Sequence, residues 1–251
     1  MQILKVISLL MDYPDARLQQ GREELTDAIS RAREISPAQR AALRDLLEHL
    51  VSGDIMDVQE TYTGLFDRGR ALSLLLFEHV HGESRDRGQA MVDLMAQYEA
   101  AGFAIGVREL PDYIPLYLEY LASLDDLDAR EGLADVAHLL ALLAARLEDR
   151  ESRYAACFRA LLQIAGEQPA TAVDELREQV AGEVRDDSLE ALDRVWEEEA
   201  VDFLQAEQQD RCPSQTTQPG KPREEVPVPL HWTDFNQQQP DAMPAREVHN
   251  G

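Results

Sequence analysis

At residues 72–77 the chain reads LSLLLF, and residues 78–87 continue it as EHVHGESRDR. A helix that is apolar on nearly all sides has to lie inside a core, so this run predicts a buried helix in an all-helical protein. The predicted helix ends in a polar segment that holds two histidines and a glycine able to turn the chain. Segments 62–70 and 109–115 mix polar and aromatic residues in a similar way. Together the three segments are typical of a binding surface on a helical scaffold rather than of an active site.

The rest of residues 1–206 shows the same helical periodicity, so we expect one all-α globular domain of about ten helices. Residues 36–39 (SPAQ) are a helix start signal, with an N-cap serine, a first-turn proline and a glutamine that closes the capping box. Further helices are predicted at about 55–66, at 129–150, which would be the longest, and at 188–206. No segment shows the two-residue alternation of a strand, which favours the all-α class.

The composition changes near residue 206. The last 41 residues hold seven of the twelve prolines, a run of three glutamines and few apolar residues. Such a segment buries too little apolar surface to offset the entropy of ordering it. We therefore expect residues 207–251 to be a Pro/Gln-rich, largely disordered tail, interrupted by one apolar island at 226–232.

The tail is expected to be dispensable for folding. Truncation after about residue 210 should leave the helical circular dichroism and the melting temperature nearly unchanged, because the segment contributes little apolar surface to a core. Thermal unfolding of the truncated and full-length chains measures this. A melting temperature lowered by many degrees would mean that the island at 226–232 docks as part of the core.

Charge and apolar patterning narrow the possible partners and location. The net charge is −24, from 48 acidic and 24 basic residues, so the chain should repel nucleic acid and anionic membranes and attract basic peptides, although acidity also serves solubility alone. The apolar start at residues 1–11 is short, and residues 12–15 (DYPD) stand where a secretory signal would have small residues. No stretch approaches the roughly 20 apolar residues that span a bilayer. We therefore expect a soluble, cytoplasmic protein.

Catalytic and metal-binding patterns are weak in this sequence. His79 and His81 invite a metal reading, but helical metal ligands stand three or four residues apart, so side chains two apart point in different directions. Partners of a helix C-terminus, or polar contacts to a ligand, explain them better. The acidic turn at 125–128 lacks the alternating register of a calcium loop, and no nucleotide-binding or nucleophile motif is present. We expect neither a metal site nor enzymatic activity.

Four segments of the chain resemble a known family. They read LLMDYP at 9–14, YTGLFD at 62–67, LLLFEHVHGESRDRGQAM at 74–91 and ELPDYIPLYLE at 109–119. These segments resemble the NarJ-type assembly chaperones of respiratory nitrate reductase, also called its delta subunit. That family belongs with the TorD- and DmsD-type chaperones among the redox-enzyme maturation proteins. The resemblance covers about residues 2–206, and its long central segment is the most specific part.

The resemblance implies an all-helical, cytoplasmic chaperone without catalytic activity. Such proteins bind the N-terminal segment of the apo catalytic (alpha) subunit, hold it competent for insertion of the molybdenum bis-guanine-dinucleotide cofactor, and delay its attachment to the membrane. They bind no cofactor stably themselves and leave the finished enzyme. TorD-type relatives tend to have Asp-His where this chain has Asp112-Tyr113. The difference places the chain in the nitrate-reductase branch and weakens any argument for a nucleotide or guanine-cofactor contact at that position.

The residues also predict how a leader-like client peptide would be held. A basic amphipathic helix in a groove needs apolar walls, and it needs carboxylates on the rim that pair with its arginines. The predicted peptide-binding residues are Phe66, Tyr113, Pro115 and Tyr117 as walls, Asp67, Glu83, Asp112 and Glu119 as rim, and His79 and His81 as polar contacts.

A second class of function stays open at this point. The same surface could belong to a helical scaffold or regulatory adaptor that binds a folded partner and has no role in maturation. Binding of an isolated N-terminal peptide would favour the chaperone, whereas binding of the folded partner alone would favour the adaptor.

Overall fold

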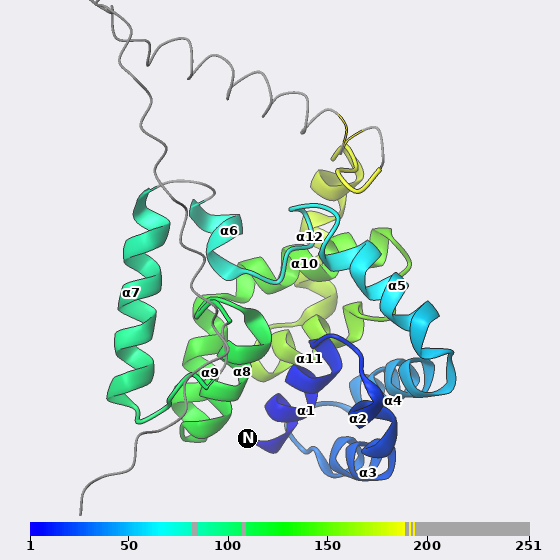
Figure 1. The fold of residues 1–251 in the computed structure, drawn as a ribbon, viewed down its shortest axis with the longest axis horizontal. Coiled ribbons are helices and arrows are strands. Elements are labelled where there is room, and N and C mark those ends of the chain that lie inside the picture. The colour runs from blue at the N-terminus through cyan, green and yellow to red at the C-terminus, as the bar shows by residue number, and fades with distance from the viewer. Residues whose placement is uncertain (82–84, 107–108, 189–190, 192, 194–251) are drawn as a thin grey trace, which may run out of the picture. The chain divides into compact units, whose positions relative to one another are not determined.

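The computed structural model describes residues 1–81, 85–106, 109–188, 191 and 193, which all belong to one structural unit, Met1–Asp202. These residues form twelve α-helices and no strand, so the predicted all-α class is confirmed for the described part of the chain (Figure 1). The tail at 207–251 and most of the predicted helix at 188–206 lie outside the described residues. The helices are α1 (Gln2–Met11), α2 (Ala16–Gln20), α3 (Arg22–Arg31), α4 (Pro37–Ser52), α5 (Ile55–Phe66), α6 (Leu76–His81), α7 (Arg85–Ala100), α8 (Ile114–Ser123), α9 (Asp126–Asp135), α10 (Ala137–Asp149), α11 (Ala155–Ala165) and α12 (Pro169–Ala181).

Local sequence sets several helix boundaries. Ser36 caps α4 as predicted, with its hydroxyl accepting a hydrogen bond from the Gln39 N–H at 3.2 Å. The side chains of Asp54 and Asp125 cap α5 and α9 in the same way. Helix α11 ends at Gly166, whose φ of +99° lies in the left-handed region that glycine adopts without strain. Capping chemistry therefore explains where these elements begin and end.

Helix α1 is central to the packing of this unit. It contacts α8, α3 and α11 and lies among them in Figure 1. The face toward these neighbours includes a buried serine, Ser8, whose hydroxyl donates a hydrogen bond to the Pro115 carbonyl at 2.9 Å. The chain start is thereby tied to the segment that opens α8. Among the described residues, no helix combines the length and apolar character that crossing a membrane requires.

The single long helix predicted at 129–150 is in fact two helices, α9 and α10, which break at Val136. The cause is a tertiary contact between α9 and α8. The Tyr117 hydroxyl donates a hydrogen bond to the Gly132 carbonyl at 2.9 Å, and the Val136 N–H bonds the Ala134 carbonyl instead of Gly132. A side chain at Gly132 would also collide with α8, because a Cβ there would stand 2.6 Å from Leu121.

The prediction of a helix across 72–77 is wrong in its first half, because α6 begins only at Leu76. Residues 72–75 are buried apart from Leu75, yet their backbone pairs with the segment before α8. The Leu74 carbonyl accepts from the Ile114 N–H at 2.8 Å, and the Leu76 N–H donates to the Asp112 carbonyl at 2.9 Å. These long-range hydrogen bonds satisfy the backbone that a helix would have satisfied locally. The apolar run is a core segment, as expected, but its first four residues form a turn, a bend and one bridge instead of a helix.

Candidate functional site

Three of the segments singled out in the sequence meet at one hollow of about 440 Å³. It forms where the end of α1, the last two turns of α5, the non-helical segment 73–75 and the segment before α8 come together. We call this hollow the aromatic groove. Its lining residues are Asp12, Tyr13, Tyr62, Phe66, Asp67, Ser73, Leu74, Leu75, Glu109, Leu110 and Tyr113.

The floor of the aromatic groove is a cluster of rings centred on two residues of α5. Tyr62 and Phe66 stand four residues apart and so share one helix face, with their ring centroids 4.9 Å apart. Beneath them lies Tyr154, which meets Phe66 edge-on at 5.0 Å. All three side chains are buried. Because packed aromatic side chains have few alternative rotamers, this floor is a preformed apolar surface.

Two tyrosine hydroxyls tie the walls of the groove to the end of α1. The Tyr62 hydroxyl donates to the Met11 carbonyl at 2.9 Å, and the Tyr113 hydroxyl donates to an Asp12 carboxylate oxygen at 3.2 Å. The two hydroxyl oxygens stand 3.3 Å from each other. Burial raises the pKa of both phenols, so each keeps its proton at neutral pH. The half-buried ring of Tyr113 is thus held as a fixed wall.

The rim of the aromatic groove is acidic. The carboxylates of Asp12, Asp67 and Glu109 are exposed at its edge, and none of its lining residues is basic. Partial burial raises the pKa of Asp67 above its ordinary value. Two large apolar side chains beside the rim, Tyr13 and Leu110, are 49% and 43% exposed. An apolar floor under a ring of carboxylates is suited to a ligand that is both apolar and cationic.

Of the predicted wall and rim residues, Phe66, Asp67 and Tyr113 line the aromatic groove. Pro115 and Tyr117 are buried in the core through α8 and do not line it. Asp112 is also fully buried and is not among the residues that line the groove. Its carboxylate accepts a hydrogen bond from the Phe77 N–H at 3.1 Å and lies 3.8 Å from an Arg87 guanidinium nitrogen.

The other predicted site residues lie elsewhere or outside the described side chains. Glu119 is exposed on α8 and lines a neighbouring hollow. His81 is the last residue of α6, but its side chain is not described. Glu83 lies outside the described residues.

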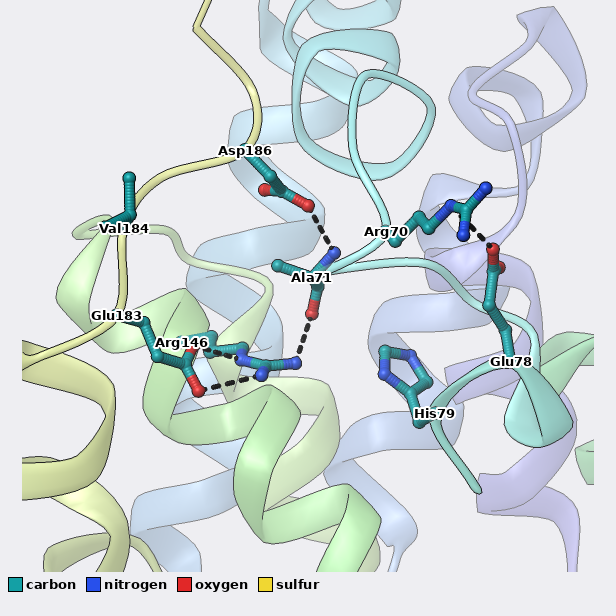
Figure 2. A pocket seen from close by; sticks show the side chains of 8 residues that line it. All are labelled: Arg70, Ala71, Glu78, His79, Arg146, Glu183, Val184 and Asp186. Atoms are coloured by element: carbon teal, nitrogen blue, oxygen red, sulfur yellow. Dashed lines mark hydrogen bonds and ion pairs between the residues drawn. The ribbon is translucent and has the colours of Figure 1, made fainter. Parts of the chain in front are cut away.

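His79 lies in a separate hollow of about 390 Å³, shown in Figure 2. Its Nε2 stands 2.8 Å from the Ser73 carbonyl, so the neutral ring donates this hydrogen bond. The opposite side of this hollow is closed by an ion pair. The Arg146 guanidinium makes two hydrogen bonds to the Glu183 carboxylate, at 2.7 and 2.8 Å, and a third to the Ala71 carbonyl. These polar groups satisfy one another, and no cluster of three potential metal ligands occurs in the described part of the chain.

Acidification should destabilise the fold through His79. Burial lowers its pKa below the ordinary 6.5, so the unfolded chain takes up a proton near pH 6.5 that the folded chain refuses. The contribution of His79 to the free energy of unfolding is therefore complete above pH 6.5 and falls as pH drops toward the lowered pKa. Denaturant unfolding between about pH 7.5 and 5.5 should show this loss in the parent and a smaller loss in His79→Gln.

A matched control for this prediction is His138→Gln, which changes an exposed histidine on α10. It should keep the pH dependence of the parent. If His79→Gln and the parent lose the same free energy of unfolding across the range, His79 does not titrate as its burial implies.

Eight residues that line the groove were not among the predicted set, namely Asp12, Tyr13, Tyr62, Ser73, Leu74, Leu75, Glu109 and Leu110. For the first three a clear signal was present in the sequence. Asp12 and Tyr13 belong to the resembling segment 9–14, and Tyr62 precedes Phe66 by four residues and so falls on the same face of a predicted helix. What the sequence lacked was any indication that the end of the first helix lies against the fifth.

Comparison with known proteins gives consistent matches. The family model described as "Nitrate reductase delta subunit" matches residues 32–160. The chain is 54% identical over 201 residues to "Nitrate reductase molybdenum cofactor assembly chaperone NarJ" of Escherichia coli (strain K12), covering 80% of this chain and 84% of the relative.

Two further relatives carry similar names. One is "Probable nitrate reductase molybdenum cofactor assembly chaperone NarW" of Escherichia coli (strain K12), 53% identical over 205 residues, or 82% of this chain and 85% of the relative. The other is "Probable nitrate reductase molybdenum cofactor assembly chaperone NarJ" of Bacillus subtilis (strain 168), 34% identical over 157 residues, or 62% of this chain and 84% of the relative.

Proposed function

We propose that this chain, which belongs to the nitrate reductase delta subunit family, is an assembly chaperone that binds the N-terminal segment of the apo alpha subunit of respiratory nitrate reductase in the aromatic groove. The single observation that carries the peptide-binding part is the groove itself. It combines a rigid apolar floor with exposed apolar walls and an all-acidic rim. The relatives' names support the chaperone part, because 54% identity over most of both chains favours a shared role.

The chemistry of the groove defines the client peptide. Tyr62 and Phe66 offer an apolar floor to an apolar face of the peptide, in the manner of a helix laid into a groove. Asp12, Asp67 and Glu109 surround that surface and would pair with arginines or lysines on the peptide's other face. The domain's excess of acids over bases also attracts a basic peptide from a distance and speeds its encounter with the groove.

In this proposal the chaperone assists insertion of the molybdenum bis-guanine-dinucleotide cofactor without catalysis. It keeps the alpha subunit's N-terminal segment in the groove while the cofactor enters the client, and it delays attachment of the client to the membrane. The chaperone holds no cofactor of its own and acts in the cytoplasm. Residues 1–206 constitute the chaperone domain in this scheme.

The proposal is tested by capture and by titration. A tagged chain expressed in cells that make nitrate reductase should retain the alpha subunit, identified by mass spectrometry. A synthetic peptide of that subunit's N-terminal segment should then bind the purified chain in calorimetry. Binding of the cofactor-loaded, folded subunit together with no binding of the peptide would favour the helical adaptor instead.

A further inference from the structure

A second hollow of about 330 Å³ adjoins the aromatic groove. Two residues at the end of α1, Asp12 and Tyr13, line both hollows. Tyr13 meets Tyr62 edge-on with ring centroids 5.6 Å apart, so its exposed ring is in contact with the aromatic floor. One side chain thus separates the two hollows and contributes to each.

The second hollow has its own apolar surface. Leu9 is 50% exposed, although α1 buries seven of its ten residues and its other exposed residues, Gln2 and Lys5, are polar. Below it the hollow is lined by the buried side chains of Leu18 and Leu25. Leu9, Tyr13 and Leu110 are three of the exposed large apolar residues of the described chain, and all three border the joined hollows. Exposed apolar side chains that gather on one surface are typical of an interaction site, whereas scattered ones are not.

The charges around the second hollow have the same sign as those of the aromatic groove. Glu119 is the one exposed residue between Ile114 and Leu121 on α8, and it opens into this hollow. Glu24, on α3, is also exposed and lines this hollow. The basic residue of the lining, Arg17, is paired with Asp15 at 2.6 Å. The hollow therefore presents exposed carboxylates around an apolar centre, as the aromatic groove does, although Glu119 also accepts a hydrogen bond from the Ser8 hydroxyl at 3.5 Å.

We propose that the second hollow is the other half of one docking surface and binds the continuation of the same basic amphipathic client segment, beyond the part seated in the aromatic groove. The inference rests on the proposed function. Charge complementarity identifies the occupant. Both hollows combine apolar side chains with exposed carboxylates, and they share Asp12 and Tyr13, so one basic amphipathic segment could occupy both. Leu9 then contacts an apolar side chain of the client, and Glu119 pairs with a cationic one.

Calorimetric titration of the full chain with the synthetic N-terminal peptide of the alpha subunit tests this inference. Leu9→Gln should weaken binding by about tenfold, as expected for loss of one apolar contact worth about 1.4 kcal/mol. The peptide is then shortened from each end in turn. Removing the end that occupies the second hollow should weaken binding to the parent by a similar factor. With that shortened peptide, Leu9→Gln should have no further effect, while a Tyr113→Ala change should still weaken binding.

The control variant is Val92→Gln on α7, which alters a side chain of comparable exposure (59%) outside both hollows, and circular dichroism checks that each variant is folded. If Leu9→Gln binds the full-length peptide with unchanged affinity while Tyr113→Ala binds it more weakly, the second hollow does not bind the peptide. The proposed function is then unaffected. If Leu9→Gln lowers the affinity by the same factor for every shortened peptide, the second hollow is overturned as well, because the substitution would then act indirectly and not through a contact with the removed end. A parent that binds no peptide overturns the proposed function itself. Sedimentation that shows a dimeric parent and a monomeric Leu9→Gln would assign the hollow to a second copy of the chain.

Discussion

Replacing Tyr113 with Ala should weaken binding of the alpha subunit's N-terminal peptide by roughly thirtyfold or more. Truncation of an aromatic anchor at the centre of an interface generally costs about 2 kcal/mol, which corresponds to that factor. Tyr113 is held as a wall by its hydrogen bond to Asp12, and its backbone bridge to Leu75 does not depend on the side chain. Calorimetric titration of the peptide against both chains measures the loss.

Two companion variants separate the contributions to this effect. Tyr113→Phe keeps the ring and removes only the hydroxyl, so it should retain most of the affinity. Glu119→Gln removes a carboxylate from the neighbouring hollow and should cost less than Tyr113→Ala, since rim charges act mainly on the association rate and its salt dependence. If Glu119→Gln proves the more damaging change, the surface recognises its client chiefly by charge.

Replacing Asp112 with Ala should lower the free energy of unfolding by about 3 kcal/mol, because it removes the acceptor of the Phe77 N–H and the buried carboxylate that Arg87 faces. The Asp112 carboxylate accepts from the Phe77 N–H in the first turn of α6 and faces Arg87 on α7. Both α6 and α7 are thereby joined to the segment that carries Tyr113. Urea unfolding followed by circular dichroism gives the difference. Asp112→Asn, which keeps an oxygen for the Phe77 N–H, should be much less damaging.

Asp112 should also give the fold a distinct pH dependence. Burial raises its pKa above the ordinary 3.8, and the Phe77 N–H and Arg87 only partly oppose this. Between the two values the folded chain holds a proton that the unfolded chain has released, so stability falls as pH rises through the raised pKa. In Asp112→Asn this part of the slope should be missing. If the free energy of unfolding changes with pH identically in both chains, the pKa of the Asp112 carboxyl is not raised by folding.

The sequence by itself determined what depends on neighbours within a turn or two. The capping residues Ser36 and Asp54 start α4 and α5 at the predicted positions, since a cap needs only the N–H groups two or three residues ahead. The all-α class follows from apolar residues at helical spacing in a chain without strand-like alternation. Acidic character followed from composition alone, and it points to a basic client.

Only the tertiary structure decided what depends on pairing between distant segments. Residues 72–75 are not helical, because the backbone around Leu75 bonds with residues 112–114, an alternative that no local pattern reveals. Along 112–119, Asp112 turns into the core while Tyr113 walls the groove, and Glu119 opens into the adjoining hollow. Because these residues are close in sequence, they were predicted to form one site. In the structure they face different surroundings, since α1 packs against α8 and the end of α1 contacts Tyr62 on α5. A groove is a property of how helices pack, because its walls come from segments whose separation along the chain says nothing of their distance in space.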